Sequence, residues 1–505
     1  MPIVLAQPVS NLHGAVIYVV ACLEADAAND GSRVAGLADG EVALRRRSVG
    51  NGDPRLGVIG RVPGLSNPLN LPVLDLDGND YQGAERAYRQ NLRGLLHEGY
   101  QKYKHGFHQL FSPIGFLVIA SADHIQEISQ VPEGALDFQG ATQIPRCLMT
   151  SRMISDYTHT ILTDLTRQLG NLLPIIHEEI EYCFQNELPA CEANWTPGNI
   201  QKLAPRLIAI IMGRVFVGPG LNRKEEWINN VTQFVDDVFA GGWKIKEYLH
   251  FARRFAARFL IPEIRQLVPI MRERLASLNA PGSSEGVELH LDLLQWLLAN
   301  NATLPQPRSL ENLAELALVA FVGSTHTAAT TLTNVLLDLA ARPADLEVVR
   351  KEVSQMNLKA TGLNLKQSFY INQTSKLDSF MKESQRLNPA FLMTFSRIVR
   401  KPFILSNGLT LPSGTHLIVP ACMISLDPEI YEDPEEFKGF RFAELRAEKP
   451  ENMRKYQFTG TSPTAMHFGY GRNGCPGRFF AGTTIKLFVA HLLVKYDIKL
   501  FRFRQ

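Results

Sequence analysis

The most informative stretch of the chain is residues 467–481, HFGYGRNGCPGRFFA, in which four glycines and a proline surround a single cysteine. Glycine lacks a Cβ and accepts positive φ, so this backbone can approach a flat bound group closely. Pro476 directly follows Cys475, and proline is favoured at the first position of a helix. We therefore expect the Cys475 sulfur at a helix N-terminus, where unpaired N–H groups and the helix dipole favour thiolate over thiol. A thiolate held in this way is a metal ligand or a nucleophile.

Two other interpretations of this segment fit less well. Cys475 could be only a buried small residue, the usual environment of a free cysteine, but that would leave the surrounding glycines unexplained. The spacing GYGRNG at 469–474 also matches a dinucleotide-binding fingerprint, with Asp497 roughly 20 residues further on. However, residues 462–467 (SPTAMH) do not form a buried strand, and only 31 of the 505 residues follow Gly474. No room remains for the second half of such a fold.

The composition excludes several classes of protein. The 52 Lys and Arg residues nearly balance the 50 Asp and Glu residues, which gives a formal net charge of +2. Such a chain lacks the strongly basic surface that binding to a nucleic-acid backbone requires. With 45% hydrophobic and 20% charged residues it is not disordered. The six cysteines include no CxxC pair, so they indicate a reducing compartment and not a disulfide framework.

Residues 1–80 are rich in glycine, aspartate, asparagine and proline, and they predict an irregular lead-in. Its apolar run at 14–23 is shorter than the roughly 20 residues that span a bilayer and lacks a basic flank, so at most it is a weak membrane anchor. We predict one large domain over 81–505.

The periodicity of the chain predicts a mainly helical fold. Between about 150 and 340 the pattern is predominantly helical, and strands are predicted only around 111–120, 403–411, 416–420 and 498–503. There is no regular alternation of strands and helices. We therefore predict a mainly α fold with small β-sheets, and not a doubly wound sheet.

Glu383 and Arg386 are spaced i, i+3 in a predicted helix that a proline ends. Such residues share one helix face and most often form an exposed pair. Arg441 stands between two phenylalanines in a stretch broken by proline and glycine, so we expect it to be partly buried. A buried guanidinium needs a carboxylate, and Glu383 is the candidate partner.

Residues 309–341 predict one long helix of roughly 50 Å. Between Leu316 and Leu337 it contains no Asp, Glu, Lys or Arg, so a transmembrane helix is one interpretation. That interpretation would place the STHT sequence of residues 324–327 in the middle of the bilayer. A buried helix fits better, because small residues at its midpoint make room for a bound group and hydroxyls can carry protons or water.

Together these segments resemble the cytochrome P450 family of haem-thiolate monooxygenases over roughly residues 85–505. The cysteine segment matches the family's FxxGxxxCxG signature at Phe468, Gly471, Cys475 and Gly477. Glu383 and Arg386 match the ExxR pair, and Arg441 matches the arginine of the PERF-type segment. The three motifs occur in the family's order. The fold implied is the mainly α cytochrome P450 fold.

The resemblance implies haem b (iron protoporphyrin IX) as the cofactor, with Cys475 as the ligand of the iron. It makes Glu383, Arg386 and Arg441 a structural network behind the haem. Residues implied to contact the haem are Phe468, Gly471, Arg472, Gly477, Gly323 and Arg397. The family usually has a basic residue two positions before the cysteine, but Asn473 stands here. Arg397 is therefore the better candidate for a haem propionate.

The long helix resembles the family's oxygen-binding helix, with Gly323 and Ser324 as the small pair and Thr327 as the alcohol. His326 occupies the place of the usual acid. By this resemblance Thr327 and His326 are the catalytic candidates: Thr327 would position a water, and His326, with an ordinary pKa near 6.5, would relay a proton. His326 could equally be a neutral, hydrogen-bonded core residue.

The sequences THT at 325–327 and LTNVLLDLA at 332–340 are similar to monooxygenases of filamentous fungi that act in secondary metabolism. The leading hypothesis is that the enzyme inserts one atom of O2 into a lipophilic small molecule, such as a terpenoid or a prenylated alkaloid. The alternatives are a haem-thiolate isomerase or dehydratase that uses no oxygen, and a haem-binding protein without turnover.

The expected partners follow from the same resemblance. The chain has no evident flavin-binding or nicotinamide-binding segment, so electrons would come from NADPH-cytochrome P450 reductase. The family's usual location is the cytosolic face of the endoplasmic reticulum, although the sequence shows no evident anchor beyond the apolar run at 14–23. The apolar side chains Phe391, Leu392 and Met393 are expected to contribute to the substrate pocket.

Overall fold

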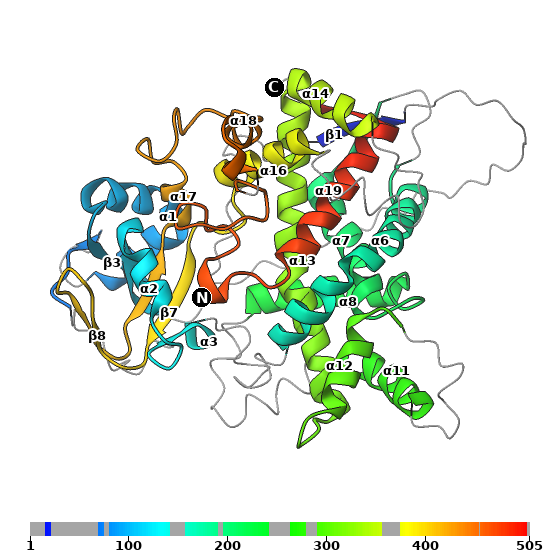
Figure 1. Ribbon diagram of the computed structural model, residues 1–505, viewed down its shortest axis with the longest axis horizontal. Helices are drawn as coiled ribbons and strands as arrows, with labels where there is room; N and C mark the ends of the chain where they lie inside the picture. Colours follow the sequence, from blue (N-terminus) through cyan, green and yellow to red (C-terminus); the bar gives the residue numbers. More distant parts are fainter. Residues whose placement is uncertain are drawn as a thin grey trace, which may run out of the picture.

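The computed structural model describes residues 16–21, 69–74, 80–141, 157–189, 195–241, 263–278, 290–355, 374–453 and 455–501. Helices dominate, and the strands form small sheets (Figure 1). The predicted mainly α class with small sheets is confirmed. The six-stranded sheet and the β8-β9 hairpin lie with α1 and α2 in one half of the molecule, while the long helices and strand β1 lie in the other half (Figure 1).

The longer helices of the described chain are α1 (Tyr81–Tyr103), α6 (Thr166–Asn186), α7 (Ile200–Phe216), α8 (Glu225–Gly241), α11 (Glu263–Leu278), α12 (Leu293–Ala302), α13 (Leu310–Ala341), α14 (Pro343–Ser354), α16 (Ser375–Leu387), α18 (Arg441–Glu448) and α19 (Arg478–Lys495). The short helices include α2 (Ile125–Gln130), α3 (Phe138–Ala141) and α17 (Ala421–Ile424).

Helix α13 is the centre of the helical half. It begins after Ser309, whose side chain accepts a hydrogen bond from the backbone N–H of Asn312 at 3.3 Å, and it contacts α7, α8, α11, α16 and α19. A helix that is apolar on all sides is buried in a core or crosses a membrane. By length and composition α13 could cross one, but 67% of its most apolar window is buried inside the protein. Its apolar sides are therefore covered by neighbouring helices.

A six-stranded sheet forms the second core, with the strand order β2-β3-β4-β10-β7-β5. Its strands are β2 (Val73–Leu74), β3 (Phe107–Ser112), β4 (Gly115–Ala120), β5 (Leu136–Asp137), β7 (Thr394–Val399) and β10 (His416–Val419). The segment 111–120, predicted to form a strand, belongs to a hairpin that begins earlier, at Phe107. The chain reverses at Gly115, whose φ of +105° favours glycine. Strand β10 pairs with β4 in parallel and with β7 in antiparallel orientation.

A three-stranded sheet joins distant parts of the chain. Strand β1 (Val16–Ala21) lies between β11 (Tyr496–Phe501) and β6 (Thr196–Gly198), antiparallel to both. These residues belong to the lead-in that was expected to be irregular, and they are the centre of the apolar run at 14–23. The structure corrects that expectation for 16–21, because β-branched residues pair there as a middle strand. The rest of 1–68 lies outside the described residues.

Candidate active site

The cysteine loop enters α19. The Cys475 backbone N–H donates to the carbonyl oxygen of Phe468 at 2.7 Å. Pro476 is not the first helical residue, as had been expected: it lies in a turn, and α19 begins at Arg478. The sulfur nevertheless lies at the helix N-terminus, because the backbone N–H groups of Gly477 and Arg478 bond to it. The expected placement of the sulfur is therefore right, although the helix starts two residues later.

Opposing effects act on the Cys475 thiol. Burial raises its pKa, while the two backbone N–H groups and the Arg478 guanidinium lower it. Burial is the larger effect, so the protein alone does not hold this sulfur as a thiolate. A bound metal cation deprotonates a coordinating thiol. The donor therefore has the chemistry of a ligand that becomes ionised when it binds its metal.

Two glycines shape the loop in front of the sulfur. Gly469 and Gly471 have φ values of +74° and +68°, in the region that favours glycine. A Cβ on Gly469 would lie 3.2 Å from the carbonyl oxygen of Asn473. By contrast, a Cβ on Gly477 would meet no described atom within 4 Å. Phe468 anchors the loop to the core, where its ring packs edge-on against Phe458 at 5.4 Å.

The midpoint of α13 also borders open space. Gly323 is exposed although it lies in the middle of a buried helix, and a Cβ there would meet no described atom within 4 Å. One turn later the Thr327 hydroxyl donates to the Gly323 carbonyl oxygen at 2.9 Å. The Ser324 hydroxyl donates in the same way to the carbonyl of Ala320 at 2.6 Å. The small residues and hydroxyls predicted for this midpoint therefore lie where a bound group has room.

His326 points to a different side of α13. Its Nε2 lies 2.9 Å from a carboxylate oxygen of Asp236 on α8, and both line a cavity of ≈ 570 Å³ between α7, α8 and α13. Burial lowers the pKa of His326, and the Asp236 carboxylate partly offsets this. The Thr325 hydroxyl lines the same cavity and has no hydrogen-bond partner among the described residues. The sequence carried no signal for Asp236, because nothing local links α8 to the midpoint of α13.

The Glu383 network consists of Glu383, Arg386 and Arg441, and all three side chains are buried. Arg386 makes two parallel bonds to the Glu383 carboxylate, at 2.7 and 2.8 Å. Arg441 contacts the same carboxylate at 3.3 Å and donates to the carbonyl oxygens of Glu432 and Asp433. The structure thus brings together the three residues that the sequence singled out, and Arg441 is buried, where partial burial was expected.

Arg397 is a buried cation of another kind. Its side chain donates to the Ser396 carbonyl at 2.8 Å and stacks on the rings of Phe395 and Phe138. No carboxylate of the described residues lies within ion-pair distance of it. Burial lowers the pKa of Arg397 to about 10, with Glu133 acting in the opposite direction. A buried guanidinium without a carboxylate is costly unless a ligand supplies one.

Arg472 and Asn473, the two residues before Gly474, bind groups of the protein itself. Arg472 is exposed, and its guanidinium donates to the Val131 carbonyl at 3.2 Å. The Asn473 amide donates to Glu133 at 3.1 Å. Asn473 is therefore occupied by a protein carboxylate. Neither Arg397 nor Arg472 has an acid partner among the described residues, but Arg397 is buried whereas Arg472 is exposed, so Arg397 stays the better candidate for a propionate.

These residues fit a haem. Cys475 offers a soft sulfur ligand at a helix end, Arg397 offers a buried cation for a carboxylate, and Gly323 and Gly477 leave space where a side chain would otherwise stand. Of the expected pocket residues, Leu392 and Met393 are buried in the second core. Residues 142–155 and 242–243 lie outside the described residues.

Comparison with known proteins points to the same chemistry. The family model for cytochrome P450 matches residues 222–505. The chain is 32% identical over 447 residues to the cytochrome P450 monooxygenase braC of Annulohypoxylon truncatum, covering 85% of this chain and 87% of that protein. It is 33% identical to the monooxygenase paxP of Penicillium paxilli, over 80% and 79% of the two chains. It is 32% identical to ent-kaurene oxidase of Gibberella intermedia, over 80% and 78%.

Proposed function

This chain belongs to the cytochrome P450 family and is a haem-dependent monooxygenase, and we propose that it oxidises a bulky lipophilic product of fungal secondary metabolism, a terpenoid or a prenylated alkaloid. The overall reaction is R–H + O2 + 2 e⁻ + 2 H⁺ → R–OH + H2O. The observation that carries the proposed substrate class is the similarity, over four-fifths of the chain, to an enzyme named for the terpenoid hydrocarbon ent-kaurene.

We propose these roles for the residues around the haem. When bound, haem supplies oxygen activation and transfer. Cys475 holds the iron, and the N–H groups at the start of α19 stabilise its negative charge. Arg397 would pair with a propionate. Gly323, Phe468, Gly471 and Gly477 would leave room for the haem, and Arg472 would add positive charge to its surroundings. The Glu383 network fixes the segment around Arg441 behind the cysteine loop.

Proton delivery is proposed for the α13 midpoint. The Thr327 hydroxyl, which donates to Gly323, holds a water on the face of α13 that borders open space. His326 and Asp236 connect the other side of α13 to the ≈ 570 Å³ cavity. A neutral imidazole can accept a proton on one nitrogen and release one from the other. His326 is thus proposed as the relay, with Asp236 as the residue that positions it.

The test of this function is oxidation with a defined source of electrons. The holoenzyme is incubated with NADPH, NADPH-cytochrome P450 reductase and an extract of fungal lipophilic metabolites, and products are read by mass. We expect a gain of one oxygen atom that derives from labelled O2. Turnover without reductase or without O2 would support an isomerase or dehydratase instead.

Thr327→Ala separates oxygenation from those alternatives. Loss of the positioned water should lower product formed per NADPH, by up to about 10²-fold if proton delivery becomes limiting, while NADPH consumption continues and peroxide accumulates. Thr331→Ala is a matched control, because its hydroxyl makes the same bond one turn away, to the Thr327 carbonyl at 2.8 Å. Equal coupling in both variants would contradict the role of Thr327.

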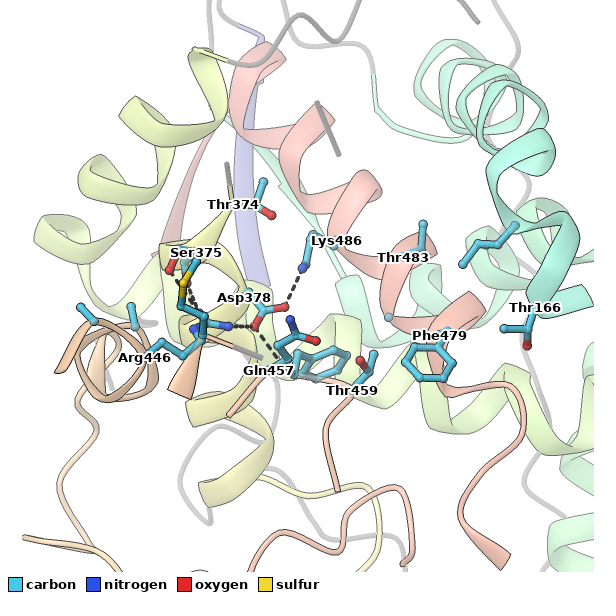
Figure 2. A pocket seen from close by; sticks show the side chains of 16 residues that line it. Thr166, Thr374, Ser375, Asp378, Arg446, Gln457, Thr459, Phe479, Thr483 and Lys486 are labelled. Atoms are coloured by element: carbon cyan, nitrogen blue, oxygen red, sulfur yellow. Dashed lines mark hydrogen bonds and ion pairs between the residues drawn. The ribbon is translucent and has the colours of Figure 1, made fainter. Parts of the chain in front are cut away.

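We propose that the reductase docks on the face where α19 begins. A pocket of ≈ 580 Å³ lies there between α6, α16, α18 and α19, and Figure 2 shows Phe479 and Lys486 at its wall. Phe479, four residues after Cys475, is 37% exposed, and Met453 on the same pocket is 52% exposed. Exposed apolar side chains beside the iron ligand suit a transient partner that must bring electrons close.

Phe479→Ala should therefore raise the reductase concentration needed for half-maximal turnover, while chemical reduction by dithionite stays unchanged. Ile404→Ala is the control, because Ile404 is 68% exposed on the small hairpin of β8 (Phe403–Ile404) and β9 (Thr410–Leu411). An equal response of both variants would contradict docking at this face. By family resemblance we place the enzyme with its reductase on the cytosolic face of the endoplasmic reticulum, which cell fractionation tests.

A further inference from the structure

Two histidines and a glutamate meet between α6 and α19, about 20 Å along α19 from the cysteine loop. His177 and Glu181 are one turn apart on α6, and His491 faces them from α19. Figure 1 shows the two helices side by side, and they pack against each other. One ligand atom from each residue lies within 4.8 Å of the others. None of the three takes part in the site around Cys475.

The hydrogen bonds of this cluster leave two nitrogens facing each other. His177 Nδ1 lies 2.9 Å from His491 Nε2. The other nitrogen of His491, Nδ1, lies 3.1 Å from a Glu181 carboxylate oxygen. A carboxylate is an acceptor, so Nδ1 of a neutral His491 carries a proton and its Nε2 accepts a hydrogen bond from His177 Nδ1. A metal ion between the two nitrogens replaces this hydrogen bond, and His177 then takes its other tautomer, with the proton on Nε2. In metal sites a carboxylate orients a ligating imidazole in the same way.

The distance between the two imidazole nitrogens suits a small transition-metal ion. Two nitrogens at 2.0–2.1 Å from a tetrahedral zinc ion lie about 3.3 Å apart. The 2.9 Å between the imidazoles therefore has to widen by only a few tenths of an ångström. His177 is half-buried, so ions and water reach the cluster from its side. Burial and the neighbouring His491 lower the pKa of His177, which keeps its ring neutral and able to ligate.

We propose that His177 and His491, supported by Glu181, bind one divalent transition ion of the zinc class and thereby cross-link α6 to α19. Imidazole pairs select Zn²⁺, Ni²⁺ or Cu²⁺ over Mg²⁺ and Ca²⁺. Water completes the coordination, and Glu181 either orients His491 or turns to become a third ligand. The site is independent of the reaction at the haem.

Lys495 is the competitor of the ion. Its ammonium pairs with the second oxygen of Glu181 and places a positive charge beside the cluster. However, Lys495 is 41% exposed, so the side chain can turn into solvent when a cation binds. The ammonium therefore weakens the affinity of the site for the ion without blocking it. Removing this side chain should raise that affinity.

The test is zinc binding by the holoenzyme after treatment with a chelator. Equilibrium dialysis against Zn²⁺ should load one zinc per chain, counted separately from iron. X-ray absorption at the zinc edge, to which iron does not contribute, should show two imidazole nitrogens at about 2.0–2.1 Å. Absence of stoichiometric zinc, or zinc without imidazole ligands, would overturn the proposal.

Substitutions of single residues test which side chains bind the ion. His177→Gln should lower the zinc affinity at least about 10-fold, and Glu181→Gln about 10-fold, whereas Lys495→Ala should raise it several-fold. The matched control is His105→Gln, because His105 also lies 2.9 Å from a carboxylate, that of Asp123, but is 67% exposed. An unchanged haem spectrum shows that each variant is folded. Zinc bound equally well by His177→Gln, or lost equally in His105→Gln, would contradict the assignment.

Discussion

Two buried arginines, 11 residues apart in the sequence, are satisfied in opposite ways. Arg386 is 1% exposed and makes two bonds to Glu383 plus bonds to the carbonyl oxygens of Ser425, Pro434 and Glu436. Arg397 is 5% exposed, yet within the described part of the chain its guanidinium donates only to the Ser396 carbonyl. Burying a charge without a counter-charge is costly. Arg386 has its counter-charge within the protein, and we propose that a ligand supplies the one for Arg397.

Lys382 is a third buried cation, next to Glu383 in the sequence. It has more hydrogen-bond partners than Arg397 but fewer than Arg386. Its ammonium donates to the carbonyl oxygens of Gln457 and Gly460, on the stretch that leads into the cysteine loop. Burial lowers the pKa of Lys382 to about 8. A lysine can therefore lose its charge where an arginine cannot. The three cations give three different predictions for stability and haem binding.

The largest effect is expected from Glu383→Gln. The substitution leaves the guanidinium groups of Arg386 and Arg441 buried without a carboxylate, so unfolding free energy should fall by about 3–5 kcal/mol and little haem-loaded protein should accumulate. Urea unfolding measures the loss. The control is Glu432→Gln, because the Glu432 side chain is 86% exposed and pairs only weakly, with Lys438 at 3.9 Å. A loss below about 1 kcal/mol would show that the Glu383 network is dispensable.

The second-largest effect is a dependence of the unfolding free energy on pH, caused by Lys382. Between about pH 8 and 10.5 the unfolded chain still holds the proton that the folded Lys382 has lost, so stability should rise with pH across this window. The gain in unfolding free energy is at most about 3–4 kcal/mol, since one pKa unit corresponds to about 1.4 kcal/mol. The unfolding free energies of the wild type and of Lys382→Met, measured at pH 7.5 and at pH 10, isolate the contribution of Lys382. A difference that does not change with pH would contradict a buried, titrating Lys382.

The smallest effect is expected for Arg397→Gln, which should weaken haem binding without lowering the stability of the apoprotein. Haem should dissociate about 10- to 100-fold faster, because hydrogen bonds to a charged group contribute about 1.5–3 kcal/mol, while the apoprotein should be as stable as wild type or more so. Transfer of haem to an excess of apomyoglobin measures the rate. Arg397→Lys should lie between the two, since it keeps the charge. A destabilised apoprotein with an unchanged haem dissociation rate would show that Arg397 is structural.

Sequence reasoning succeeded where the deciding contacts are local. The long helix was predicted at 309–341 and is found at Leu310–Ala341 with Ser309 as its cap. The pairing of Glu383 with Arg441 followed from the phenylalanines around the arginine, which imply burial, and from the rule that a buried cation needs an anion. Both inferences use neighbours within one or two turns and one general electrostatic rule.

Sequence reasoning failed where the deciding contacts are distant. Strand β1 pairs with β11, more than 470 residues later in the chain, and no local pattern announces such a partner. The contact between His326 and Asp236 joins two helices, and neither residue alone predicts it. Pro476 was placed at the start of the helix by propensity, but residues 476–477 form a turn and the helix starts at Arg478.

The central claim is that Cys475 binds the haem iron as a thiolate, and the difference spectrum of the reduced holoenzyme with carbon monoxide tests it most directly. We predict the long-wavelength Soret band of a thiolate opposite carbon monoxide, and its loss in Cys475→Ser. A band at the shorter wavelength of histidine-ligated haem in the wild type, or a long-wavelength band that persists in Cys475→Ser, would contradict the account.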